Sequence, residues 1–265
     1  MPARIPRVTK TEALVLRYRR LGEADRIVTL LTPGRGKIDA VAKGVLRPRS
    51  KLGGHLEPAL QVEVLLAHGR NLDIITQAQT VDGFAALHGD LERLSIAMYL
   101  VELADRFTVE RPSGSEGRAV YELLRVSLVR LARGDGRQLV TRSFELALLG
   151  ETGFRPEWRL CTACGAAVEA DAAAWSALGG GVVCSDCRPA HPEAGPIDAT
   201  VLKVLRAIQD RPYEEAARIR LTSPLAAGLE RVMHELMQAV AERELKGQQF
   251  VKEVRRAGAA AAGEQ

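Results

Sequence analysis

Four cysteines carry the strongest chemical signal in this sequence of 265 residues. Cys161 and Cys164 form one Cys-x-x-Cys pair, Cys184 and Cys187 form a second, and the chain has no other cysteine. Each pair can place two thiolates on one metal ion, and two such pairs complete a tetrahedral site. The pattern is typical of a zinc ribbon, so the sequence predicts one structural Zn²⁺ per chain.

A sphere of four thiolates has no open position for a catalytic water, so we expect this zinc to hold its segment together without performing chemistry. His191, four residues after Cys187, is a candidate reserve ligand, and the alternative is that it is simply an exposed side chain. Two alternatives stay open. The thiols carry no metal, or they form a dithiol redox site, although no thioredoxin-like βαβ pattern surrounds either pair.

Positive charge is concentrated near the N-terminus. Residues 1–83 carry 14 Lys and Arg but only 8 Asp and Glu. The remaining residues carry 23 Lys and Arg and 25 Asp and Glu, so that the net charge of the whole chain is +4. A basic segment joined to a near-neutral remainder indicates a polyanion-binding module. The candidate DNA-binding residues are Arg17, Arg19, Arg20, Arg35, Lys37, Lys43, Arg47, Arg49 and Lys51.

Pro48 disfavours helix at Arg47, so the sequence predicts an extended loop over residues 47–51 that can follow a phosphate backbone. The alternative is a solvated barrel face that binds nothing. Tyr18 and Phe84 are the only aromatic residues up to position 84. We therefore expect binding mainly through phosphates, with steep salt dependence and tolerance of both single and double strands.

Known catalytic motifs are missing from the sequence. It contains no Walker loop, no Gly-x-Ser-x-Gly and no His-Glu-x-x-His, so we do not expect an enzyme. Glu23 and Asp25 form a near pair of carboxylates that a Mg²⁺-dependent nuclease would need. The arginines around them favour an ion-pair network instead.

Five strands have to position the basic residues. Apolar and β-branched runs interrupted by Gly and Pro predict strands over residues 11–18, 26–32, 37–42, 61–66 and 72–77. Five short strands in about 70 residues are typical of a small barrel such as an OB-fold, although an SH3-like barrel fits nearly as well.

After Phe84 the apolar period becomes helical. The first predicted helix buries a face of Leu87, Leu91, Leu94, Met98, Val101 and Leu103. A second follows a capping box at Ser113 and Glu116, and a third spans residues 139–149. Helical signals resume at an Asp198 cap, at Pro212 and at Ser223-Pro224.

The predicted fold class is therefore α+β and multidomain. An N-terminal OB-fold barrel that binds nucleic acid covers residues 1–83. A C-terminal helical domain covers residues 84–157 and 193–256, with a four-cysteine zinc-finger insert at 158–192 and a disordered tail at 257–265. No apolar run is long enough for a membrane span, and the N-terminal residues do not form a secretory signal. We therefore expect a cytoplasmic protein without a membrane partner.

Several of these segments together resemble the RecO family of bacterial DNA repair proteins, which are recombination mediators. The likeness covers about residues 8–250, and the two cysteine pairs stand where many family members carry theirs, after Gly153-Phe154. The segments that carry it are residues 11–18, 21–25, 31–37, 41–44, 47–52 and 56–58.

The resemblance implies an OB-fold, a helical domain and a zinc finger. It also implies binding of ssDNA and dsDNA and annealing of complementary strands. With RecR as a partner, such a protein helps to load RecA onto ssDNA coated by the single-strand binding protein SSB. Some relatives also bind the C-terminal tail of SSB. The barrel would then carry DNA and much of the RecR contact, and the protein would associate with the nucleoid when on DNA. The alternatives are a zinc-ribbon interaction scaffold, an RNA-binding factor without annealing activity, and the nuclease considered above.

Overall fold

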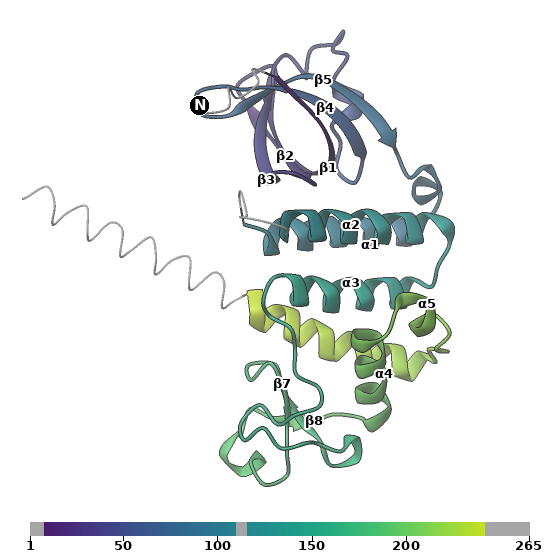
Figure 1. The fold of residues 1–265 in the computed structure, drawn as a ribbon. Helices are drawn as coiled ribbons and strands as arrows, with labels where there is room; N and C mark the ends of the chain where they lie inside the picture. Colours follow the sequence, from purple (N-terminus) through teal and green to yellow (C-terminus); the bar gives the residue numbers. More distant parts are fainter. Residues whose placement is uncertain (1–7, 110–115, 242–265) are drawn as a thin grey trace, which may run out of the picture. The chain divides into compact units, whose positions relative to one another are not determined.

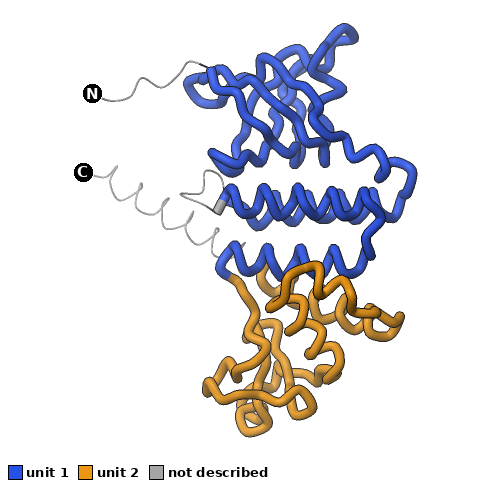
Figure 2. The backbone as a smooth tube through the Cα atoms, turned by 45° about the vertical axis from the view of Figure 1, so that its right-hand side comes forward, with its two compact units in different colours: residues 1–153 blue, residues 154–265 orange. Residues whose placement is uncertain are grey.

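The computed structural model of the chain describes residues 8–109 and 116–241 (Figure 1). It divides into two compact units, Met1–Gly153 and Phe154–Gln265 (Figure 2). Ser113 of the predicted capping box and the predicted tail at 257–265 lie outside the described residues. The finer domain boundaries at residues 83, 157, 192 and 256 stay predictions.

Five strands close into a barrel at the start of the first unit (Figure 1). Their order around the barrel is β1-β2-β3-β5-β4, and β3 runs parallel to β5 while the other neighbours are antiparallel. The five strands confirm the predicted β-domain, and this closure is OB-like. The strands are β1 Val8–Leu21, β2 Asp25–Thr32, β3 Gly36–Ala42, β4 Gln61–Ala67 and β5 Asp73–Asp82.

Alternating side chains fill the barrel. Val28 and Leu30 from β2, Ala40 from β3 and Val62 from β4 are fully buried in one apolar cluster. Such alternation is expected where one face of each strand points inward. The last five residues of β1, in contrast, are all exposed. The end of the β1–β2 hairpin, residues 17–26, therefore extends beyond the core, and we call it the hairpin tip.

Three helices complete the first unit: α1 Leu91–Phe107, α2 Glu116–Arg133 and α3 Arg137–Glu151. The predicted buried face of α1 was partly wrong, because Leu91 is 83% exposed and Met98 is 40% exposed. The helix instead buries Ala97 and Ala104 completely, together with large neighbours such as Leu100. Small alanines allow close helix packing, and a pattern of large apolar residues misses them.

The second unit holds a small sheet and further helices. Strands β6 Ala174–Ser176, β7 Gly181–Val183 and β8 Gly195–Pro196 pair in the order β7-β6-β8. Helices α4 Ala199–Asp210 and α5 Tyr213–Ala216 follow, and residues 223–241 are helical. Short 3₁₀ turns lie at η1 Gly53–His55, η2 Ala85–Gly89, η3 Ala170–Ala172 and η4 Arg188–Ala190.

The Asp198 cap predicted for this unit is confirmed. The Asp198 carboxylate accepts hydrogen bonds from the backbone N–H groups of Thr200 and Val201, as an N-cap does. Val182 and Val183 lie on a hairpin strand that leads to the second cysteine pair. Among the described helices of the whole chain, none is long and apolar enough to cross a membrane.

Candidate functional site

The four cysteines converge on one point. Their sulfur atoms all lie within 4.8 Å of one another, and the Sγ atoms of Cys164 and Cys184 are 3.8 Å apart. A tetrahedral ion with Zn–S bonds of about 2.3 Å would place its sulfurs about 3.8 Å from each other. All four thiols are free of disulfides. The cluster therefore has the donor set and spacing of a closed four-thiolate metal site.

Backbone hydrogen bonds hold each pair of cysteines in a tight turn. Gly165 N–H donates to the Cys161 carbonyl at 2.8 Å, and Gly165 has a positive φ of 76° that favours glycine. In the second pair, Arg188 N–H donates to the Cys184 carbonyl at 3.0 Å. The Cys184 N–H lies 3.4 Å from the Cys161 sulfur, which joins the two turns.

The protonation of the thiols fits a cluster that binds a cation. Burial raises the pKa of Cys161, but N–H donors from Cys184, Cys164 and Ala163 outweigh it and lower that pKa to about 6. Hydrogen bonds with Cys184 and Cys164 raise the pKa of Cys187 to about 12. The Cys161 thiolate is thus stabilised by the backbone, and Cys187 holds a proton that a bound cation would displace.

His191 does not belong to this cluster. Its Nδ1 atom lies 3.1 Å from the Glu193 carboxylate, and among the described residues only the four cysteines gather as metal ligands. The predicted reserve role of His191 therefore has no support in the geometry.

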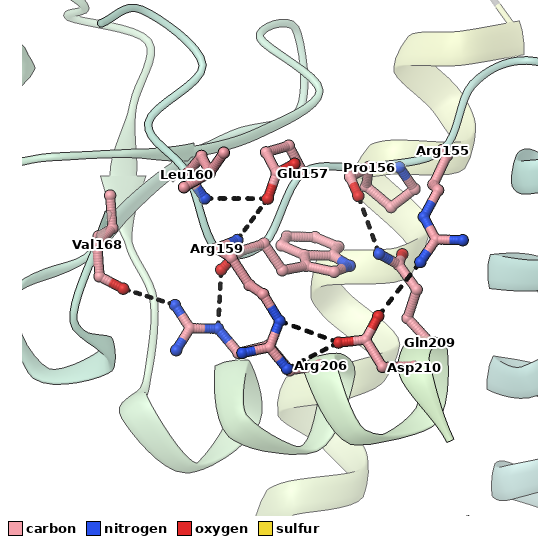
Figure 3. A network of polar contacts seen from close by, with 10 residues as sticks. Arg155, Pro156, Glu157, Arg159, Leu160, Val168, Arg206, Gln209 and Asp210 are labelled. Carbon is pink, nitrogen blue, oxygen red and sulfur yellow. Dashed lines mark hydrogen bonds and ion pairs between the residues drawn. The ribbon is translucent and has the colours of Figure 1, made fainter. Parts of the chain in front are cut away.

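Helix α4 holds the segment that leads to the first cysteine pair (Figure 3). The Arg206 guanidinium donates to the carbonyls of Trp158 at 2.8 Å and Val168 at 2.7 Å. Gln209 donates to the Pro156 carbonyl at 3.1 Å. The indole of Trp158 is buried and lies 6.3 Å from the Trp175 ring, centroid to centroid. The cysteine turns are therefore built on a small core fixed to α4.

Four of the predicted DNA-binding residues lie on one loop, residues 43–51, which we call the basic loop. Lys43, Arg47, Arg49 and Lys51 are all exposed, and none forms an ion pair with a described residue. The buried side chain of Val45 anchors the loop in the barrel core. The Leu46 N–H also donates to the Ala24 carbonyl at 2.9 Å, which ties the loop to the hairpin tip.

The prediction of an extended loop is wrong. Residues 43–49 form consecutive turns, and the Ser50 N–H donates to the Arg47 carbonyl at 2.9 Å. Pro48 thus occupies the second position of a β-turn, where its fixed φ is favourable. Pro48 disfavours a helix at Arg47, but it is as compatible with a tight turn as with an extended chain, and the structure has the turn.

Asp25 organises the start of the basic loop. Its carboxylate accepts a hydrogen bond from the Gly44 N–H at 2.7 Å, and Gly44 has a positive φ of 64°. Within the described residues, neither Glu23 nor Asp25 forms an ion pair, so the expected network of arginines around them is absent. Asp25 instead holds the backbone of the loop in place.

The other predicted cations are mostly paired. Arg17 Nε lies 2.6 Å from the Asp105 carboxylate on α1, and Lys37 Nζ donates to the Asp105 carbonyl and lies 3.3 Å from its carboxylate. The Lys37 side chain is only 11% exposed. These two residues attach the barrel to α1, a role that sequence reasoning missed because Asp105 lies far along the chain.

Two further cations are paired within the barrel, and one is free. Arg19 lies 3.4 Å from Asp39, and Arg35 lies 2.5 Å from Asp73. Arg20 is exposed and makes no ion pair with a described residue. The predicted set therefore divides into five unpaired, solvent-facing cations and four paired ones. DNA contact by any of them stays a prediction.

Comparison of the amino-acid sequence with known protein families identifies the family of this chain. The family model described as "Recombination protein O N terminal" matches residues 7–84, and "Recombination protein O C terminal" matches residues 88–249. The chain belongs to the RecO family. This assignment confirms the resemblance seen in the sequence, and the two models cover the barrel, the helices and the cysteine cluster.

Curated members of the RecO family are similar to the chain over most of its length. A protein named DNA repair protein RecO from Roseiflexus sp. (strain RS-1) is 36% identical over 94% of this chain and 87% of its own. One of the same name from Heliobacterium modesticaldum is 37% identical over 94% of this chain and 91% of its own. The protein of that name from Dehalococcoides mccartyi (strain CBDB1) is 36% identical over 91% of this chain and 94% of its own.

Proposed function

We propose that this RecO-family chain is a recombination mediator that binds ssDNA and dsDNA and anneals complementary strands. With RecR, it helps to load RecA onto ssDNA coated by SSB. One structural observation carries the DNA-binding part of the proposal. Arg20, Lys43, Arg47, Arg49 and Lys51 are exposed cations without an ion-pair partner among the described residues, on a tip and a loop that bond to each other.

The proposed mechanism is electrostatic and needs no nucleotide hydrolysis. Two complementary strands repel each other through their phosphates, and a surface with unpaired cations lowers that repulsion while concentrating both strands. Base pairing then supplies both the free energy and the sequence specificity. The protein acts by binding, and it reads no base sequence.

We further propose that the four cysteines bind a structural Zn²⁺. The spacing of their sulfurs and the backbone donors at Cys161 support this assignment. When bound, the ion would supply positive charge that keeps all four thiols deprotonated and closes the two turns onto each other. It would have no open coordination position for chemistry.

Charge reversal of the basic loop tests the proposed DNA surface. The fourfold variant Lys43→Glu, Arg47→Glu, Arg49→Glu and Lys51→Glu should lose annealing and most DNA binding. Its metal content and helical circular dichroism should match the wild type, because the four side chains are exposed. Annealing is followed by the fluorescence of complementary labelled oligonucleotides.

A matched control carries the same charge change in the second unit: Arg188→Glu, Arg211→Glu, Arg218→Glu and Arg220→Glu, all at exposed positions. This control should anneal nearly as well as the wild type. Annealing at the wild-type rate by the basic-loop variant would refute the proposed surface. Absence of DNA binding by the wild-type protein, in low salt, would refute the proposed function itself.

A further inference from the structure

The hairpin tip exposes the only aromatic side chain of the barrel strands. Tyr18 is 37% exposed, whereas Phe84, the other aromatic residue in the first 84, is buried. Tyr18 lies in the part of β1 where all residues are exposed, and it is not among the buried residues of the barrel core. A large ring presented to solvent beside unpaired cations is a candidate contact for a ligand.

A fixed arginine covers one face of this ring. Tyr18 pairs with Val28 across the hairpin and Arg20 pairs with Arg26, so Arg26 is the diagonal neighbour of Tyr18. The Arg26 Cζ atom lies 3.7 Å from the centre of the Tyr18 ring. An ion pair of 2.8 Å with Glu57 holds the same guanidinium, whose side chain is only 14% exposed. The ring is therefore held in a fixed orientation by a cation that is itself fixed.

Unpaired cations flank the ring. Arg20 lies two residues after Tyr18 on the same face of β1, because side chains alternate along a strand. Ala42 pairs with Arg26 on the next strand, so Lys43 and the basic loop begin at this same end of the hairpin. A flat π-system placed on Tyr18 would thus lie at the same end of the hairpin as these unpaired cations.

We propose that a nucleobase of single-stranded DNA stacks on Tyr18, and that Arg26 holds the ring for this contact. This inference rests on the proposed function, because it needs a strand on the basic surface. Bases of a single strand offer free faces to an aromatic ring. Bases in a duplex are already stacked on each other and must be unstacked first. Tyr18 therefore gives the barrel a preference for single over double strands that phosphate contacts alone do not provide.

The competing explanation is that Tyr18 and Arg26 only stabilise the hairpin. Cross-strand pairs and cation–π contacts both stabilise hairpins in this way. A structural role predicts that removal of the ring weakens ssDNA and dsDNA binding alike, and that removal of another tip side chain does the same. A stacking role predicts an effect on ssDNA alone.

The test compares Tyr18→Leu, Tyr18→Phe and the tip control Leu21→Ala, whose side chain is 40% exposed in the wild type. Affinity for ssDNA and dsDNA of equal length is measured over a range of salt concentrations. Stacking is followed by the quenching of 2-aminopurine placed in the single strand.

Tyr18→Leu should weaken ssDNA binding by about tenfold and remove the quenching, leaving dsDNA affinity unchanged. Its salt slope should equal that of the wild type, because no phosphate contact is lost. Tyr18→Phe and Leu21→Ala should bind like the wild type. Equal ssDNA affinity in Tyr18→Leu, or an equal loss for both kinds of DNA, would overturn the stacking site. It would leave the proposed function intact, which fails only if the wild type binds no DNA.

Discussion

At the scale of single residues, the partner of a charged side chain decides what that side chain can do. The sequence identified nine basic residues, and it could not show which of them are paired. Lys37 and Arg17 meet Asp105, which lies 68 positions after Lys37. Charge counting locates an excess of cations, but only the tertiary structure separates structural cations from free ones.

Lys37 and Arg49 should therefore respond differently to loss of charge. Lys37→Met removes a nearly buried partner of Asp105 and should lower the free energy of unfolding by about 1–3 kcal/mol, measured by urea denaturation. The salt slope of DNA binding should stay the same. Arg49→Met, at an exposed position, should change stability by less than about 0.5 kcal/mol. It should reduce the ssDNA salt slope by about 0.7, and a reversed pattern would contradict the division into paired and free cations.

Residue chemistry also sets the behaviour of the cysteine cluster. We expect about one Zn²⁺ per purified chain, and Cys164→Ser should lose the metal and unfold its segment while the barrel stays folded. Ser185→Ala is the control, since its hydroxyl contacts only Asp186 in the described structure. Element analysis and thermal melting provide the measurements. Metal-free wild-type protein, or a metal-loaded Cys164→Ser variant, would contradict the assignment.

The same cluster should release its metal in acid. All four thiols must lose their protons to bind the ion, and protonation competes with the metal as the pH falls. The raised pKa of Cys187, about 12 without a bound ion, keeps that thiol protonated until a cation displaces the proton. Metal occupancy at a fixed concentration of chelator should therefore decrease from pH 8 to pH 5. Occupancy that rises or stays constant over this range would exclude a thiolate site.

At the scale of elements, local patterns were sufficient wherever local chemistry decides the structure. Apolar and β-branched runs interrupted by Gly and Pro located all five barrel strands, and Asp198 marked the start of α4. The predictions failed where packing decides, at Leu91 on the exposed side of α1 and in the turns around Pro48. The clustering of the four cysteines followed from their spacing, whereas the role of Arg206 did not, because its carbonyl partners lie 38 and 48 positions away.

Arg206 connects helix α4 to the segment around the first cysteine pair through two hydrogen bonds. Arg206→Met keeps most of the side-chain volume but leaves the Trp158 and Val168 carbonyls without their donor. We expect the second unit to lose about 2–4 kcal/mol of stability, since each unsatisfied buried acceptor costs about 1–3 kcal/mol. Metal release to a chelator should accelerate as well. Lys203→Met on the same helix is the control, because the Lys203 side chain is exposed and lies 3.8 Å from an exposed carboxylate, that of Asp171.

At the scale of the whole molecule, charge is segregated along the chain. The excess of cations in residues 1–83 is partly used within the first unit, where Arg17, Lys37, Arg19 and Arg35 meet carboxylates. Of the nine predicted DNA-binding cations, Arg20 and the four in the basic loop are left for a polyanion. The net charge of the whole chain, +4, hides the excess of cations in residues 1–83, because residues 84–265 carry slightly more acidic than basic side chains.

The salt dependence of DNA binding measures how many of these charges the complex uses. Neutralisation of about five phosphates by Arg20, Lys43, Arg47, Arg49 and Lys51 predicts a slope of about −3.5 for log affinity against log salt with a single strand. Affinity should then fall by about a hundredfold between 50 and 200 mM salt. If the paired cations also contacted DNA, their carboxylates would have to be displaced, and the slope would approach about −6. A slope near zero would exclude a phosphate-binding barrel, so this one titration distinguishes the free cations from the full predicted set.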